Sequence, residues 1–249
     1  MVVDCCNDDC LYFIRGFSAS HRGKQEFQDC AVNVSYSPFL RRLFNLYLKL
    51  KLRRYFQKVV LDTRLTEQNL RSDLPVIWVA NHLSWWDGFL IAEAQRKLLP
   101  NAFHYTLMLE HELSRFPFFR KLGGLGITPH QGSSVAHAFG LLKMLTHSHF
   151  QTSIAFFPQG EIVPSLSRPV VFKKGIELFI RTLGSVQIIP VGLHLEPMNT
   201  PLPSAFVWVG KPLLVVETEE LSAEYLAGQV ELLLEEGAKF LSAALRQEI

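Results

Sequence analysis

The sequence predicts an α/β fold, with a mixed, largely parallel sheet flanked by helices and preceded by a basic amphipathic helix. Short apolar runs of strand length alternate with longer segments of helical periodicity, an alternation typical of parallel sheets. The chain has 249 residues, of which 48% are hydrophobic, enough to build one sizeable core. We expect a poorly ordered leader over residues 1–36, an amphipathic helix over 37–62 and an α/β domain over 63–249.

The first predicted element is a helix that opens at Ser37-Pro38, because proline is tolerated at a helix start. Leucine and aromatic side chains alternate there with bases at helical spacing, and no acid interrupts them up to Val60. Such a helix is typical of a segment lying in a membrane interface, where several bases together bind anionic lipids. The alternative is a core helix with a solvated charged face. The bases are Arg41, Arg42, Lys49, Lys51, Arg53, Arg54 and Lys58.

The α/β domain is expected to begin with a buried strand over residues 75–80, an apolar run of β-rich character. Gly123-Gly124 interrupts a later strand, which indicates a close approach of two backbones. The further elements are expected to be a helix over 86–97, a strand over 103–109, a short irregular segment over 110–119, a strand over 122–127, a helix from 133 to about 145, a strand over 152–157, a helix over 172–183, a strand over 187–195, short strands over 206–209 and 213–216, and a helix over 222–246.

Composition excludes some classes of protein and leaves others open. The net charge of +2 is too small to indicate a nucleic-acid binder. No apolar run reaches the length of about 18 residues that a membrane-spanning helix needs, and the N-terminus lacks the order of a signal peptide. The cysteines all lie within the first 30 residues and show no zinc-binding spacing. We therefore expect a cytoplasmic location, reduced thiols and no metal site.

The turn after the first buried strand carries the strongest candidate for chemistry. His82 stands at the end of the strand, and Asp87 follows at the start of the next helix. On one continuous helix this spacing would hold the two side chains about 140° apart, but across a strand-to-helix turn they can meet. A carboxylate bonded to one ring nitrogen fixes the tautomer and leaves the other nitrogen free as a general base. The alternative is that both are ordinary, satisfied loop residues.

Four motifs occur in a fixed order along the chain and carry a resemblance to a known family. They are Asn81-His82 with Asp87, Phe116-Pro117 leading to Gly123-Gly124, Phe157-Pro158-Gln159-Gly160, and Ile189-Pro190-Val191, with Lys173-Lys174-Gly175 between the last two. Over roughly residues 38–215 this series resembles the successive sequence blocks of the glycerophosphate and lysophospholipid acyltransferases.

The resemblance implies an O-acyltransferase at the cytoplasmic face of a membrane. The donor would be an acyl-CoA or acyl carrier protein thioester, the acceptor a hydroxyl of a lysophospholipid-like or glycolipid-like molecule, and no cofactor would be needed. His82 would deprotonate the acceptor, Asp87 would orient His82, and backbone N–H groups around Gly160 would stabilise the oxyanion. The substrate-binding residues would be Asn81, Ser84, Phe157, Pro158, Gln159, Gly160, Glu161, Lys173 and Lys174.

The sequence departs from the family pattern on the acceptor side. The second motif ends in Thr128-Pro129-His130 without the arginine that grips a phosphate, and Gln159 replaces the acid of the third motif. Glu161-Ile162 stands at the end of that motif, where a cation is usual. Fewer cations favour a neutral, sugar-bearing or amino-acid-bearing acceptor, although Arg168, Lys173 or Lys174 could still bind a phosphate.

Three alternatives to this reading stay open from the sequence. Ser84 could act as a nucleophile, but we expect it to be a turn or cap residue, since the chain has no Gly-x-Ser-x-Gly motif. The protein could be a catalytically silent relative that binds lipid or an acyl carrier. It could also be a thioesterase that uses the same base on water.

Overall fold

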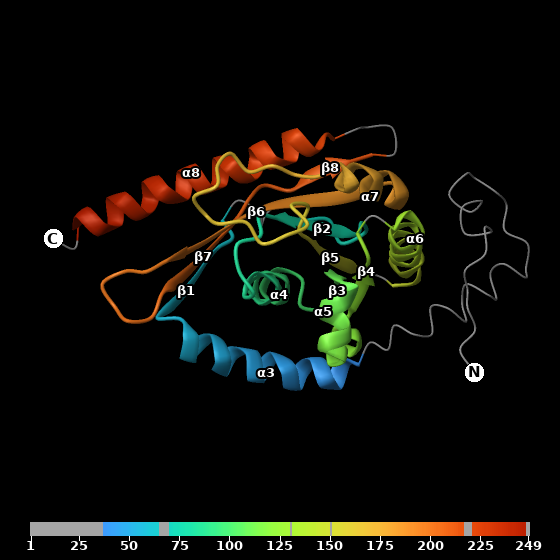
Figure 1. Ribbon diagram of the computed structural model, residues 1–249, viewed down its shortest axis with the longest axis horizontal. Helices are drawn as coiled ribbons and strands as arrows, with labels where there is room; N and C mark the ends of the chain where they lie inside the picture. The colour runs from blue at the N-terminus through green and yellow to red at the C-terminus, as the bar shows by residue number, and fades with distance from the viewer. Residues whose placement is uncertain (1–36, 65–69, 130, 150, 217–220, 248–249) are drawn as a thin grey trace, which may run out of the picture.

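The computed structural model describes residues 37–64, 70–129, 131–149, 151–216 and 221–247. The predicted leader over 1–36, with its cysteines, lies outside the described residues. In Figure 1 a sheet runs through the middle of the domain, with helices on both of its faces. The α/β fold predicted from the sequence is confirmed.

Within the described residues eight strands form one sheet, in the order β1-β7-β6-β2-β5-β3-β4, with β8 also paired to β6. The neighbours β1–β7, β2–β5, β2–β6, β3–β4 and β3–β5 are parallel, whereas β6 pairs antiparallel with β7 and β8. The sheet is thus mixed and largely parallel, as predicted. Its strands are β1 (Lys58–Asp62), β2 (Val76–Ala80), β3 (Phe103–Leu109), β4 (Gly124–Ile127), β5 (Thr152–Phe156), β6 (Val186–Glu196), β7 (Ser204–Val209) and β8 (Leu213–Val215).

Two layers of helices cover the sheet (Figure 1). On one face lie α6 (Gly132–Ser148), α7 (Gly175–Leu183) and α8 (Ala223–Gln247), and on the other lie α4 (Asp87–Leu98) and α3 (Pro38–Tyr55). The short α5 (Glu110–Arg115) and the 3-10 helix η1 (Pro117–Leu122) join β3 to β4.

The central strand β2 explains why its sequence is a continuous apolar run. All five of its residues are buried, because helices cover both faces of the sheet. Ile77 packs into the core beneath α6, α7 and α8, whereas Trp78 packs into the core beneath α3 and α4. The carboxyl end of β2 is therefore held from both sides, and the residues that follow it start from a fixed position.

The predicted helix over 37–62 is shorter in the structure. It starts as expected, with the Ser37 side chain accepting a hydrogen bond from the Leu40 N–H, but it ends at Tyr55. Residues Lys58–Asp62 instead form β1, which pairs in parallel with β7. The β-branched Val59 and Val60 are half-buried there, and such side chains favour a strand over a helix. The α/β sheet thus begins inside the segment predicted as helix.

The close backbone approach predicted at Gly123-Gly124 is present. Gly123 has φ 94°, and a Cβ at this position would overlap the carbonyl oxygen of His104.

Gly123→Ala is therefore expected to lower the free energy of unfolding by about 3 kcal/mol or more. Gly228 in α8 has no atom within 4 Å of such a Cβ, so Gly228→Ala should stabilise by up to about 1 kcal/mol. Urea denaturation of both variants checks this, and equal stabilities would contradict it.

Candidate active site

The turn between β2 and α4 brings His82 and Asp87 into contact. His82 Nδ1 lies 2.7 Å from Asp87 Oδ2. The Asp87 side chain is fully buried, whereas 24% of the His82 side chain is exposed. The imidazole therefore has one nitrogen fixed by the carboxylate and its other edge available, the arrangement that a general base requires.

Asp87 is held by more than the imidazole. Its Oδ2 also accepts hydrogen bonds from the backbone N–H groups of Leu83 at 2.6 Å and Ser84 at 2.8 Å. Its Oδ1 accepts the Ser84 hydroxyl at 2.6 Å. Asp87 is also the first residue of α4, where the helix dipole favours a negative charge. This set of donors stabilises a buried carboxylate, which in turn directs the Nδ1–H of His82 toward itself.

The Ser84 hydroxyl holds the turn between β2 and α4. Its hydroxyl donates to Asp87 and accepts from the Trp86 N–H at 3.1 Å. The hydroxyl is therefore engaged in holding the turn rather than placed as a nucleophile activated by His82.

The third motif braces His82 from a second loop. The Gln159 side-chain oxygen accepts the His82 N–H at 2.6 Å, and the Phe157 ring stacks on the imidazole at 4.6 Å between centroids. The His82 carbonyl accepts the Val163 N–H at 2.8 Å. Gln159 is buried, and its side-chain oxygen contacts the His82 backbone. The sequence had suggested a contact with substrate for this residue.

Asn81 also has a structural partner. Its side-chain amide donates to the Leu193 carbonyl at 2.9 Å and accepts the Leu193 N–H at 2.8 Å. The side chain thus ties the end of β2 to β6, and both polar groups of the amide are used inside the protein. Pro158 likewise serves the loop, because its carbonyl accepts the Lys173 N–H at 3.0 Å.

The segment after Pro158 presents backbone N–H groups beside His82. Gly160 has φ 71°, and its own N–H donates to the Phe157 carbonyl. The N–H groups of Glu161 and Ile162 donate to no acceptor among the residues that the structure describes. Both residues line the same cavity as His82. The sequence predicted oxyanion donors around Gly160. In the structure the N–H groups without an acceptor are those of the next two residues, Glu161 and Ile162.

The candidate cations on the acceptor side differ in availability. Lys173 Nζ lies 3.5 Å from Glu161 Oε1, and both side chains are largely exposed. Lys174 is exposed at the N-cap of α7. Arg168, in contrast, forms an ion pair with Glu231 of α8, and is therefore not poised for an acceptor. His130 lies outside the described residues.

A cavity of about 460 Å³ leads from His82 along the face of the sheet beneath α3. Its walls are mostly apolar. α4 contributes Gly88, Phe89, Ala92 and Gln95; β3 contributes, among others, His104, Thr106 and Met108; and α3 contributes Arg41, Phe44 and Asn45. An apolar cavity that opens at the histidine has the character of a binding site for an aliphatic chain.

Two residues that line this cavity, Gln95 and His104, each have a buried side-chain polar atom without a partner among the described residues. Gln95 is 2% exposed and His104 is 4% exposed. Among the described residues, neither Gln95 Nε2 nor His104 Nδ1 has a hydrogen-bond partner. The sequence analysis singled out neither residue. The spacing of Gly88, Ala92 and Gln95 on one face of α4 is a signal that could have revealed the first.

The buried His104 should make stability depend on pH. Burial and, to a smaller extent, the Arg41 guanidinium lower the pKa of His104 from 6.5 to about 3. Below pH 6.5 the unfolded chain gains a proton here while the folded chain stays neutral, so the folded state loses stability as pH falls. The free energy of unfolding should drop by about 1 kcal/mol per pH unit through this group.

Urea denaturation between pH 7 and pH 4.5 measures this effect. His104→Leu should become more stable relative to wild type as the pH falls, whereas His111→Leu, at an exposed position, should keep a constant difference. A constant difference for His104→Leu as well would contradict the prediction.

A comparison with known protein families identifies the family of this chain. The model of the family described as Acyltransferase matches residues 63–194, which span β2, the His82–Asp87 turn and most of the sheet. The protein is thus an acyltransferase enzyme of lipid metabolism. The chain belongs to the glycerophosphate and lysophospholipid acyltransferase family. No curated protein matches the chain closely enough to count as a relative.

No group of three or more His, Cys, Asp or Glu residues that could hold a metal ion occurs among the described residues. In the same part of the chain, no helix combines the length and the apolar character needed to cross a bilayer.

Proposed function

We propose that the enzyme transfers a fatty acyl group from a thioester to a lipid hydroxyl, with His82 as general base. The supporting observation is the 2.7 Å contact between His82 Nδ1 and the buried Asp87 carboxylate, together with the mostly apolar cavity that His82 lines. The donor is an acyl-CoA or an acyl carrier protein. Both would deliver the same thioester group.

The reaction proceeds by direct attack. The second ring nitrogen of His82 takes the proton of the acceptor hydroxyl as its oxygen attacks the thioester carbonyl carbon. Asp87 stabilises the imidazolium that forms. The tetrahedral intermediate then collapses, the carbon–sulfur bond breaks, and the imidazolium returns the proton to the leaving thiolate. The products are an ester and a free thiol.

The oxyanion of the intermediate requires preorganised donors. We assign this role to the backbone N–H groups of Glu161 and Ile162. They follow the left-handed Gly160 and have no acceptor among the described residues. They belong to the loop that also carries Phe157 and Gln159, which brace His82. One loop thus holds both the base and the donors at a fixed spacing.

The acceptor is a lysophospholipid-like or glycolipid-like molecule. Glu161 and Lys173 form an exposed ion pair beside the site, and this pair can bind sugar hydroxyls or, through Lys173 and Lys174, a phosphate. Arg168 is bound to Glu231, so Lys173 and Lys174 are the remaining candidates among the acceptor-binding cations suggested by the sequence. A weakly cationic acceptor site favours a headgroup without a phosphate dianion.

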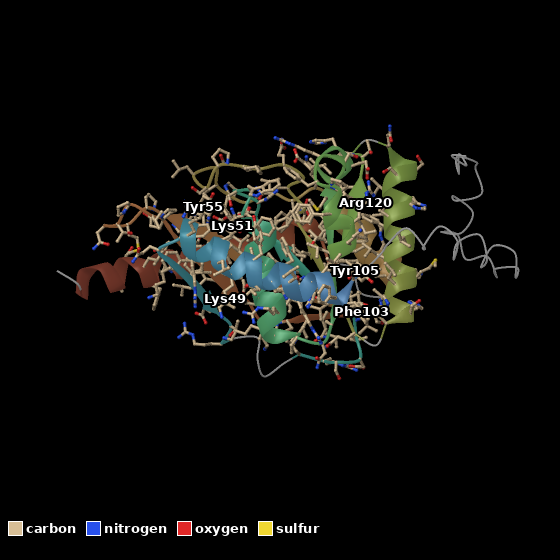
Figure 2. All side chains as sticks on the ribbon, turned by 90° about the horizontal axis from the view of Figure 1, so that it is seen from below. Lys49, Lys51, Tyr55, Phe103, Tyr105 and Arg120 are labelled. Atoms are coloured by element: carbon tan, nitrogen blue, oxygen red, sulfur yellow. The ribbon has the colours of Figure 1, made fainter. Side chains whose placement is uncertain are left out.

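The membrane-facing element is α3. Its exposed side carries a continuous apolar stripe at helical spacing, flanked by the exposed bases Arg42, Lys49 and Arg53. Such a stripe would lie in the interface of an anionic leaflet, with the cytoplasmic face of a membrane as the expected site. Seen from below, α3 lies in front of the domain (Figure 2). The stripe consists of Phe39, Leu43, Leu46, Tyr47 and Leu50, which are 52–74% exposed.

Arg41 does not belong to the bases of the membrane-facing side. Its guanidinium donates to the His104 carbonyl at 3.3 Å, and the residue lines the cavity. The sequence could not separate it from its neighbour Arg42, because adjacent bases look alike until the buried side of the helix is known.

The test measures thiol release together with the lipid product. Purified protein is incubated with acyl-CoA or acyl carrier protein and with separate lysophospholipid and glycolipid fractions on vesicles. Transfer predicts thiol release that depends on an acceptor and an equal amount of new ester. A thioesterase would release thiol and free fatty acid without an acceptor, and a silent lipid-binding relative would release none.

A further inference from the structure

We infer that the surface that contacts the membrane extends beyond α3, across η1, to Trp85 in the His82–Asp87 turn. The proposed function gives the membrane contact to the apolar stripe of α3 alone. This inference rests on that proposal and adds two elements to it, so that the turn that carries the base would itself lie at the bilayer surface. The partner is an anionic lipid surface.

The two flanks of the apolar stripe on α3 differ in chemistry. One flank carries exposed bases such as Lys49. The other carries Tyr47, Lys51 and Tyr55, which are spaced by four residues and therefore share one face of the helix. The Lys51 amine lies 5.4 Å from the centroid of the Tyr47 ring and 5.6 Å from that of Tyr55. In Figure 2 Lys49 lies on one side of α3, and Lys51 and Tyr55 lie on the other.

The aromatic flank of α3 continues onto η1. The Phe44 ring contacts Tyr47 on α3 and Phe118 on η1, with 6.0 Å between ring centroids in each case. The Ser37 N–H donates to the Lys121 carbonyl at 3.1 Å, which holds the start of α3 against the end of η1. Phe118 therefore continues the surface that Tyr47 begins.

The same flank reaches the turn that carries the catalytic base. The Tyr55 ring lies 4.9 Å from the Trp86 ring. The neighbouring Trp85 ring lies 5.2 Å from Phe116, which directly precedes η1. Trp85 also lines the same cavity as His82. A connected series of rings thus leads from the outer side of α3 to the cavity of the proposed active site.

Four large rings of this series are exposed, and we call them the aromatic rim. Tyrosine and tryptophan are enriched at the level of lipid headgroups, because each has an apolar ring and a polar group that stays hydrated. Aromatic rings also occur at protein interfaces, so the charge around the rim has to separate the two kinds of partner. The rim consists of Tyr47, Tyr55, Trp85 and Phe118, which are 43–52% exposed.

The charges around the aromatic rim favour a lipid surface. The sequences of α3, η1 and residues 83–86 contain no Asp or Glu. Arg115 and Lys121, at the two ends of the η1 region, are exposed, and Glu110 of the preceding α5 is ion-paired with Arg120. An anionic bilayer accepts bases at its headgroups and rings just below them. It also covers the apolar stripe of α3, which a strongly acidic protein would not match.

The experiment places a fluorescent reporter on the rim but outside the cavity. Phe118→Trp is made in a Trp85→Phe background, because Trp85 lines the cavity and a lipid tail bound there would also quench its emission. Vesicles of phosphatidylcholine and phosphatidylglycerol with brominated chains should quench the new tryptophan and shift its emission to the blue. Phe240→Trp in the same background is the matched control. Phe240 is 55% exposed on α8, and a tryptophan there should be neither quenched nor shifted.

A flotation assay with the same lipids measures how much the rim contributes. Phe118→Ser should weaken partition into the vesicles by about tenfold, the expected effect of withdrawing part of one large apolar side chain from water. Phe240→Ser should leave the partition unchanged. Both assays are also run on His82→Ala, so that neither result depends on catalysis.

Quenching at residue 118 supports the inference, and its absence overturns it. If the protein floats through the α3 stripe and residue 118 is not quenched, membrane binding by α3 and the proposed acyl transfer both stand without the rim. If residue 118 is quenched and no acyl transfer occurs, the rim stands and the proposed reaction fails. Shielding of the new tryptophan by acyl carrier protein or by a second copy of the chain, without quenching by vesicles, would assign the rim to a protein partner and overturn the inference.

Discussion

His82→Ala is expected to lower the rate of acyl transfer by about a thousandfold or more. The substitution removes the general base and the acid that protonates the leaving thiolate, and general acid–base catalysis contributes about 10²–10⁴-fold. The fold should survive, because the His82 backbone keeps its contacts with Gln159 and Val163. Thiol release and lipid product, measured with the preferred acceptor, report the loss.

Two further variants test whether the loss of acyl transfer in His82→Ala comes from the loss of the general base. Asp87→Asn keeps the shape of the side chain but removes its charge, and it should lower transfer by about a hundredfold or more through misorientation of the imidazole. His111→Ala removes a histidine whose side chain is 71% exposed, and it should retain full activity. Full transfer by His82→Ala would show that the base lies elsewhere.

Replacing the apolar stripe of α3 should release the enzyme from membranes. The triple variant Phe39→Ser, Leu43→Ser, Leu50→Ser removes three side chains that are 56–74% exposed in the structure. Each would contribute about 1–2 kcal/mol by burial in the interface. Together they should weaken partition into anionic vesicles by about a hundredfold or more. Flotation of protein with liposomes measures the partition.

The control lies on the opposite side of the domain. Tyr225, Leu232 and Phe240 are 46–55% exposed on α8, a helix with several acidic residues. Their replacement by serine should leave flotation unchanged, because acidic residues and an anionic surface repel. If both triple variants float like wild type, α3 is not the membrane-binding element.

The bases of α3 can be tested separately. Arg42, Lys49 and Arg53 are exposed, and each base near an anionic leaflet contributes about 1 kcal/mol. Their replacement by glutamine should weaken binding to anionic vesicles and leave the weaker binding to neutral vesicles unchanged. Arg41 is kept in this variant, since its contact with His104 belongs to the cavity.

The sequence predicted the features that depend on local patterns. The strands β2, β3, β5 and β6 are largely apolar runs with clear limits. The meeting of His82 and Asp87, five residues apart, follows from their positions in the turn between a strand end and a helix start. The strand β1 was missed because its edge position gives it a half-buried pattern, which continues the amphipathic appearance of α3.

The roles of the supporting residues could not be predicted, because their partners are distant in sequence. Gln159 contacts a backbone 77 residues away, and Asn81 contacts a strand 112 residues away. A motif shows that such residues occur near the site. Only the folded structure shows that their side chains bind backbone groups of distant segments. The unpaired atoms of Gln95 and His104 are of the same kind, because their significance depends on what surrounds them.

The position of α3 has a consequence for how substrates arrive. Its outer side carries the apolar stripe, while its inner side, through Phe44 and Asn45, forms a wall of the cavity. With α3 bound in the interface as proposed, a single layer of helix would separate the bilayer from the cavity, and a lipid tail would pass between them without exposure to water. Attachment to the membrane and access of a lipid tail to the cavity would then both depend on one helix, and a substitution that alters its tilt would change both together.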